Sequence, residues 1–170
     1  ASDVYKRQVI YILDKSGSMK EDFGGTSKRI AASNAITALT KSLKQNANID
    51  ARFSMVTFSG NKTTGMWGQG DTKTWDDAEV AVSWTTDAGT IERGSKPTSN
   101  GGTNYQAGIR TAKELLTSKR AGAMTAVIFI SDGDPTFYYN PDGYTRGDGN
   151  NDGNGGADNL KVCLDAAKNE

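Results

Sequence analysis

Two apolar runs limit what this chain can fold into more than any other feature of its sequence. Residues 9–13 read VIYIL and residues 125–130 read TAVIFI, and an aspartate follows each run within two residues. Neither run alternates with polar residues, as a strand with one face in water would. Continuous apolar runs of this length are typical of strands covered on both faces, which occur mainly in parallel sheets. The two runs therefore predict an α/β fold with helices on both faces of a sheet.

Strand and helix patterns alternate along the rest of the chain and support this fold class. Helical patterns cover residues 28–46, 103–118 and 157–168. Thr26 or Ser27 can cap the first of them. Residues 51–60 predict a further strand, and residues 78–86 alternate apolar and polar side chains as a half-exposed edge strand does. This order predicts a doubly wound, Rossmann-like, mainly parallel sheet flanked by helices.

The length of 170 residues suits one domain, and both ends look like those of a fragment. Residues 1–8 are polar and are interpreted as a flanking segment, which leaves residues 9–170 as the domain. The far end stops inside a helical pattern. We therefore expect this chain to be a fragment whose true ends lie outside it.

The composition excludes several classes of protein. Twenty lysines and arginines balance twenty aspartates and glutamates, which argues against nucleic-acid binding and against attachment to a membrane by charge. No apolar run approaches the roughly 20 residues that a membrane helix needs. The chain has no histidine, which removes histidine-based catalysis and most zinc sites. The one cysteine, Cys163, cannot form an internal disulfide and is expected to be buried as a small apolar residue.

Oxygen-bearing side chains follow both apolar runs. Asp14, Ser16 and Ser18 come directly after the first run, and Asp132 comes shortly after the second. The loops that follow the strands of a doubly wound sheet gather at one edge, so the two aspartates meet if their strands are neighbours. Thr103 follows paired glycines at the start of a helical pattern and is expected at the same edge.

This set of side chains predicts a metal site. Two carboxylates in one crowded place repel each other unless a cation lies between them. Carboxylate and hydroxyl oxygens without histidine or cysteine select a hard ion, so we expect Mg²⁺, with Mn²⁺ or Ca²⁺ as alternatives. For the first loop alone, an ordinary turn with Asx and serine hydrogen bonds is the alternative.

Three segments carry a resemblance to a known family. DKSGSM at residues 14–19, GGTN at 101–104 and SDGDP at 131–135 resemble the metal-ion-dependent adhesion site of the von Willebrand factor type A domain. That site joins an Asp-x-Ser-x-Ser pattern with a distant threonine and a distant aspartate. The matching residues here are Asp14, Ser16, Ser18, Thr103 and Asp132. The resemblance covers nearly the whole chain and implies a Rossmann-like sheet of about six strands that holds the ion at its edge, with one coordination position left for a partner. Only four strands are visible in the sequence, so the resemblance also implies a fold that is incomplete at the C-terminus, with its last strands missing.

The resemblance also implies a function. The segment VIFISDGDPTFYYN is similar to the type A domains of Gram-positive bacterial surface proteins, including pilus-tip adhesins. It implies an adhesion module that is secreted and fixed at the bacterial cell surface or cell wall. The implied partner is a host or extracellular-matrix protein, of which an exposed carboxylate completes the coordination of the divalent cation. No nucleic-acid partner, no membrane insertion within this segment and no enzymatic activity are expected.

Two other functions are alternatives to adhesion. Type A domains also serve as intracellular assembly partners of chelatase or ATPase complexes, which are expected to carry an acidic tail or adjoining ATPase motifs. A hydrolase that uses a hard metal to activate water is the other alternative. The chain has no glycine loop of the Walker type and no nucleophile–base pair that would support it.

A stretch rich in glycine, asparagine and aspartate, residues 140–159, predicts a mobile loop. Asp148, Asn150 and Asp152 match the opening of a calcium-binding loop, with a flexible solvated loop as the alternative. Residues 146–148 also read RGD, which resembles the tripeptide read by animal integrins and also arises by chance in such a loop.

Aromatic side chains in predicted loops are candidates for contact with a partner. Trp67, Tyr138 and Tyr139 are the residues concerned. Amphipathic aromatic side chains are common in binding surfaces, but they also pin loops to a sheet. The sequence leaves these two roles open.

Overall fold

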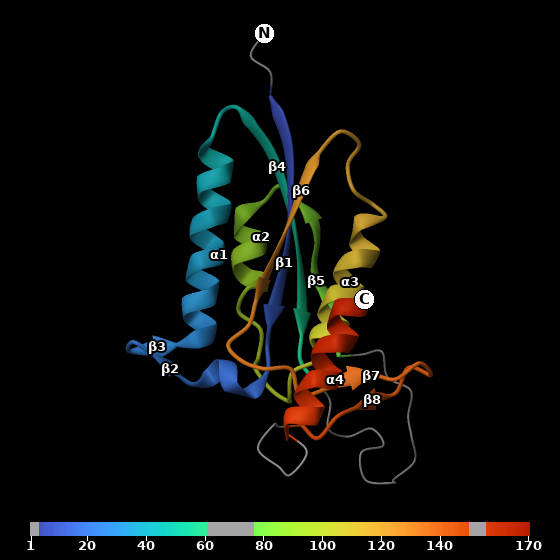
Figure 1. The fold of residues 1–170 in the computed structure, drawn as a ribbon. Coiled ribbons are helices and arrows are strands. Elements are labelled where there is room, and N and C mark those ends of the chain that lie inside the picture. Colours follow the sequence, from blue (N-terminus) through green and yellow to red (C-terminus); the bar gives the residue numbers. More distant parts are fainter. Residues whose placement is uncertain (1–3, 61–76, 150–155) are drawn as a thin grey trace.

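The computed structural model describes residues 4–60, 77–149 and 156–170 and places four strands in one sheet. The strands are β1 (Tyr5–Asp14), β4 (Ile49–Phe58), β5 (Ala78–Thr85) and β6 (Met124–Ile130). Their order is β5-β4-β1-β6, with β1 parallel to both of its neighbours and β5 antiparallel to β4 (Figure 1). The predicted mainly parallel sheet is confirmed, and residues 78–86 do form an edge strand.

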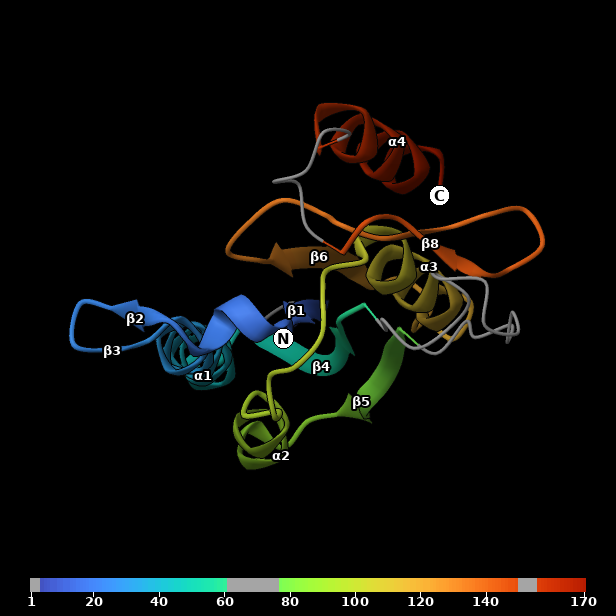
Figure 2. The same ribbon diagram turned by 90° about the horizontal axis from the view of Figure 1, so that it is seen from below.

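Helices lie on both faces of this sheet. They are α1 (Lys28–Gln45), α2 (Ala88–Gly94), α3 (Tyr105–Leu116) and α4 (Gly156–Asn169). Seen along the strands, α1 and α2 lie on one side of the sheet and α3 on the other, with α4 packed against α3 (Figure 2). No helix within the described ranges is long and apolar enough to cross a membrane. The predicted α/β class is therefore confirmed.

The first apolar run behaves as its sequence predicts, because β1 is buried on both faces. Val9, Tyr11 and Leu13 face the side of α1 and α2, whereas Ile10 and Ile12 face the side of α3. This division follows from the alternation of side chains along a strand. Burial of this run fixes the position of the residues that follow it at the end of the strand.

The second apolar run differs from the prediction that both of its faces are covered. It forms β6, which lies at the edge of the sheet and pairs only with β1 among the described residues. Met124, Val127 and Phe129 remain 64%, 48% and 37% exposed. The reason is topological, since β6 is an edge strand with a strand neighbour on only one side among the described residues. The expectation that further strands are missing stays a prediction.

The strand β1 begins earlier than its apolar run. Residues 5–8, expected as flanking sequence, continue the parallel ladder with β4, and the Tyr5 amide donates to the Asn48 carbonyl at 2.8 Å. Gln8 is buried, and its side-chain oxygen accepts a hydrogen bond from the Arg120 amide at 2.5 Å. Hydropathy alone did not predict this part of the strand, because its side chains are mostly polar.

Short elements connect the main ones and were not predicted. They are the 3₁₀ helix η1 (Gly17–Lys20), the hairpin of β2 (Asp22–Phe23) with β3 (Thr26–Ser27), and the hairpin of β7 (Tyr138–Tyr139) with β8 (Thr145–Arg146). The second hairpin gives regular structure to part of the predicted mobile loop, residues 140–159. In its turn, the Asn140 side chain accepts a hydrogen bond from the Tyr144 amide at 2.9 Å.

Cys163 is buried on α4, as predicted, and it is a free cysteine. Burial raises the pKa of its thiol to about 12, and the Asp148 carboxylate adds to the shift. The thiol therefore stays protonated at neutral pH and packs as an apolar group.

Candidate metal centre

The two aspartates of the sequence pattern meet at one end of the sheet. Strands β1 and β6 are parallel neighbours, and Leu13 lies opposite Ile130 in their ladder. Asp14 and the segment that begins at Ser131 therefore leave the sheet side by side, at the lower end in Figure 1. This is the edge at which doubly wound sheets bind their ligands.

Asp14 is held in place by hydrogen bonds to both of its carboxylate oxygens. It is fully buried, the Ser16 amide donates to Oδ1 at 2.6 Å, and the Ser131 hydroxyl donates to Oδ2 at 2.6 Å. Burial raises the pKa of the Asp14 carboxyl above its ordinary value, although the bonds from Ser131 and Ser16 oppose the shift. The neighbouring charge of Asp132 adds to the rise. The protein thus keeps a carboxylate where solvent does not stabilise its charge.

Hydroxyl groups connect Asp14's loop to Asp132. The 3₁₀ helix η1 turns the chain so that the Ser16 and Ser18 hydroxyl oxygens lie 3.1 Å apart. The Ser18 hydroxyl then donates to Asp132 Oδ1 at 2.9 Å. Together with the bond from the Ser16 amide to Asp14, these hydrogen bonds join four of the five predicted site residues: Asp14, Ser16, Ser18 and Asp132.

The loop of the fifth predicted residue, Thr103, is bonded to the loop of Ser16 and Ser18, whereas the hydrogen bonds of Thr103 itself go to Thr136 and Phe137. The Gly17 amide donates to the Gly101 carbonyl at 2.9 Å, and the Asn100 amide donates to the Lys15 carbonyl at 2.8 Å. Thr103 itself is buried, and its amide donates to the Thr136 hydroxyl at 3.0 Å. Backbone hydrogen bonds therefore bind its loop to the loop of Ser16 and Ser18.

The sequence reading missed a cation at this site, Lys28. Its ammonium lies 2.9 Å from Asp132 Oδ2 and 2.5 Å from Glu21 Oε2. These hydrogen bonds, to Glu21 and then to Asp132, raise the pKa of the Lys28 ammonium, so it is charged at neutral pH. No spacing rule pointed to Lys28, because it belongs to α1 and meets Asp132 only in the folded chain.

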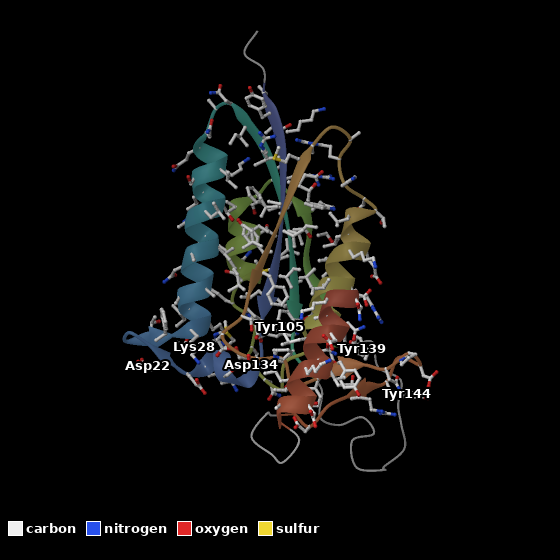
Figure 3. All side chains as sticks on the ribbon, in the orientation of Figure 1. Asp22, Lys28, Tyr105, Asp134, Tyr139 and Tyr144 are labelled. Atoms are coloured by element: carbon white, nitrogen blue, oxygen red, sulfur yellow. The ribbon has the colours of Figure 1, made fainter. Side chains whose placement is uncertain are left out.

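Tyr105 and Ser131 also support the site, and neither was predicted to do so. The Tyr105 hydroxyl donates to Ser131 Oγ at 3.1 Å and contacts the Gly133 carbonyl. Its ring packs edge-on against Phe58 and Phe129, and burial raises the pKa of its hydroxyl. The first residue of α3 is thereby linked to the loop that carries Asp132 (Figure 3).

The donor set fits a hard divalent cation. Neighbouring ligands of an octahedral ion with bonds of about 2.1 Å stand about 3 Å apart. The Ser16–Ser18 and Ser18–Asp132 oxygen pairs, at 3.1 and 2.9 Å, are compatible with this spacing, which is also that of the hydrogen bonds they form in this structure. No group of three or more histidine, cysteine or acidic side chains that could hold a metal occurs in the described ranges. Metal binding here would therefore depend on the hydroxyl oxygens as well as on the two carboxylates.

The other predicted calcium site is only partly within the described residues. Asn150 and Asp152 lie outside them. Asp148 Oδ1 accepts a hydrogen bond from the Asn159 side-chain amide at 2.8 Å, and the Asp148 amide donates back at 3.3 Å. These two bonds join Asp148 to the first turn of α4. In the RGD segment, the Arg146 guanidinium lies over the Tyr144 ring, 5.2 Å from its centroid.

The loop aromatics differ in their surroundings. Trp67 lies outside the described residues. Tyr138 is half-buried in β7, whereas Tyr139 is only 5% exposed. The Tyr139 hydroxyl accepts a hydrogen bond from the Asp77 amide at 3.0 Å, and Arg110 lies over its ring. These contacts bind the β7–β8 hairpin to the body of the domain, and contact of Tyr138 or Tyr139 with a partner stays a prediction.

The arrangement of strands and helices is that of a von Willebrand factor type A fold. This conclusion rests on structure, because no protein-family model matches the chain and a search of the curated proteins returns no match. Several of the solved structures that it resembles are those of pilus proteins.

Three solved structures illustrate the likeness. The vWF domain of the type V pili tip protein Mfa5 from Porphyromonas gingivalis gives a TM-score of 0.61 at 18% identity, over 82% of this chain and 41% of that chain. The pilus adhesin SpaC from Lactobacillus rhamnosus GG gives 0.62 at 24% identity, over 85% of this chain and 18% of that chain. The SpRpn10 VWA domain gives 0.54 at 13% identity, over 76% and 61%. The present chain thus spans less than half of each of the two pilus proteins.

Proposed function

We propose that this chain is a metal-ion-dependent adhesion module of a bacterial cell-surface protein. Asp14, Ser16 and Ser18 would hold a divalent cation from one loop, and Thr103 and Asp132 from two others. Mg²⁺ is the ion we expect, with Mn²⁺ or Ca²⁺ as alternatives. The likeness to pilus-tip and pilus-adhesin structures supports a role in binding at the outside of the cell.

One observation carries this proposal. The hydroxyls of Ser16 and Ser18 join the loop after β1 to Asp132, which follows the neighbouring parallel strand β6. An ordinary Asx turn after β1 explains the bond from the Ser16 amide to Asp14. It does not explain why a second carboxylate, only 9% exposed, lies at the same hydroxyls. Two carboxylates held together at oxygen donors are suited to share a cation.

Residues around the proposed site orient its ligands. Ser131 and the Ser16 amide orient the Asp14 carboxylate, and Tyr105 orients Ser131 in turn. When bound, the cation supplies positive charge and an open coordination position for the carboxylate of a partner protein. The chain has no histidine to activate a nucleophile, so the proposal is binding and not catalysis.

Titration calorimetry with Mg²⁺ and Mn²⁺ tests the metal part of the proposal. Asp14→Ala and Asp132→Ala should each lower the affinity by more than about a hundredfold, since changes outside the direct ligands already cost 10- to 100-fold. Asp165→Asn is the matched control, because Asp165 is an exposed carboxylate of α4 that pairs with Lys161 at 2.6 Å. Equal metal uptake by the wild type and both alanine variants would refute the site.

The partner part is tested separately with immobilised extracellular-matrix proteins. Binding should be seen in Mg²⁺ and disappear in EDTA. Esterification of the carboxylates of the matrix protein should also abolish it, because the partner contributes a carboxylate ligand. Binding that survives both treatments would favour an assembly module over an adhesin.

A further inference from the structure

Lys28 occupies an unusual place for a lysine. It is the first residue of α1, whose first turn contains no acidic residue, and the neighbouring position is Arg29. Positive charge at a helix N-terminus is unfavourable, because the helix dipole is positive there. The stability of α1 therefore does not explain a lysine at this position. The explanation lies in the acidic groups that pair with its ammonium.

Those acidic groups are Glu21 and Asp132. The Lys28 ammonium binds both, at 2.5 and 2.9 Å, and its side chain is 25% exposed. Asp132 is 9% exposed and belongs to the candidate metal site, whereas Glu21 is 65% exposed and lies outside it. One ammonium thus bridges a buried site carboxylate and an exposed carboxylate. In Figure 3, Lys28 lies at the base of α1, between Asp22 on the hairpin to its left and Asp134 to its right.

Both oxygens of Asp132 are already engaged in this arrangement. Oδ1 accepts from the Ser18 hydroxyl and Oδ2 accepts from Lys28. A divalent cation placed among these donors meets the ammonium at close range, and like charges at close range in a partly buried place repel strongly. The cation and the ammonium therefore compete for Asp132.

We infer that Lys28 is an internal competitor that sets the affinity of the metal site, an inference that rests on the proposed function. When a metal binds, the ammonium leaves Asp132 and keeps Glu21 as its partner. When the metal is absent, the ammonium neutralises Asp132 and limits its repulsion from Asp14. Lys28 thereby stabilises the metal-free state and lowers the affinity of the site for the cation.

Titration calorimetry of Lys28→Met with Mg²⁺ tests this inference. Methionine matches the apolar part of the lysine side chain and removes its charge. The variant should therefore bind Mg²⁺ roughly three- to tenfold more tightly, the effect of one partly exposed charge-assisted hydrogen bond. Lys28→Arg should stay close to the wild type. Lys20→Met is the control for a general change of charge, since Lys20 is exposed on η1. Equal or weaker binding by Lys28→Met, or an equal gain in Lys20→Met, would overturn the inference.

A second variant tests the transfer to Glu21 without altering Lys28. Glu21→Gln removes the alternative partner, so the ammonium should hold Asp132 more firmly and Mg²⁺ binding should weaken by about threefold. Asp22→Asn removes the same charge from the next, exposed residue and should have a smaller effect. Equal effects of the two variants would overturn the transfer.

The outcomes separate this inference from the proposed function. If neither the wild type nor Lys28→Met takes up Mg²⁺, the metal site is wrong and the competition falls with it. If the wild type binds Mg²⁺ and Lys28→Met binds it no more tightly, only the competition is wrong. Thermal unfolding provides a check on folding: the rise in Tm caused by saturating Mg²⁺ should be larger in Lys28→Met than in the wild type.

Discussion

A buried carboxylate such as that of Asp14 lowers the stability of a protein unless something compensates its charge. Here hydrogen bonds from Ser16 and Ser131 compensate only in part, because burial still raises the pKa of Asp14. A site that holds such a group gives up stability for function, as binding sites often do. The removal of the charge should therefore affect stability and metal binding in opposite directions.

Asp14→Asn provides this test. The asparagine oxygen can accept from the Ser16 amide and its NH₂ can donate to Ser131, so both contacts survive. In EDTA at neutral pH the variant should be more stable than the wild type by on the order of 1 kcal/mol, measured by urea unfolding, and it should lose Mg²⁺ binding. A variant that is less stable and still binds Mg²⁺ would show that the Asp14 charge neither lowers stability nor holds the metal.

The same variant gives a prediction for pH. The folded-state pKa of Asp14 is raised, so its favourable contribution to stability is complete below the unfolded pKa and is lost as the pH rises through the folded pKa. The advantage of Asp14→Asn over the metal-free wild type should therefore grow from acidic to neutral pH. Carboxyls whose pKa is lowered, such as Glu79 and Glu170, change stability with pH in the opposite direction. Both proteins contain them, so their contributions cancel when the two proteins are compared.

The residues of the site were predictable from sequence to different degrees. Asp14, Ser16, Ser18 and Asp132 follow the ends of strands, so hydropathy and the parallel topology placed them together. Lys28 and Tyr105 meet the site from two helices, and no local pattern records such long-range contacts. Their partners depend on how α1 and α3 pack against the sheet.

At the scale of elements, the site depends on how three loops are bound to one another. Gly101 is central to this, since its carbonyl accepts from the Gly17 amide at 2.9 Å. Its φ of +77° favours glycine, and a Cβ there would lie 2.4 Å from the Gly60 carbonyl oxygen. Two independent constraints thus exclude a side chain at this position.

Gly101→Ala and Gly24→Ala separate these constraints. Gly24 has a φ of +62° with nothing within 4 Å of a Cβ, so alanine should cost only the backbone term, about 1 kcal/mol. Gly101→Ala should cost about 2–4 kcal/mol because the steric clash is added, and it should weaken Mg²⁺ binding by displacing the loop of Thr103. Urea unfolding and calorimetry measure the two effects. Equal losses in the two variants would show that the loop contact is unimportant.

The short elements explain why the sequence reading was incomplete at this scale. Long periodic segments such as α1 and α3 were predicted within a few residues. The helix α2 has seven residues, and the hairpin strands β2, β3, β7 and β8 have two each, which is too short for a period to emerge. These elements form because of side-chain caps and tertiary contacts. Asp87, for example, caps α2 by accepting from the Gly89 and Thr90 amides.

At the scale of the whole molecule, the order of patterns along the chain was enough to predict the α/β class. It was not enough to predict the surroundings of β6. A continuous apolar run indicates that a strand suits a covered position, but it does not say which other segment covers it. Within the described residues, β6 has a strand partner on one side only.

The proposed metal site needs three loops from separate parts of the molecule to converge on one ion. Diffraction from crystals soaked with Mn²⁺, measured at the manganese absorption edge, would locate that ion. We expect one anomalous peak within bonding distance of the Ser16 and Ser18 hydroxyls, between Asp14 and Asp132 and next to the loop of Thr103. At saturating Mn²⁺, a peak elsewhere, or none at this edge of the sheet, would contradict the proposed site.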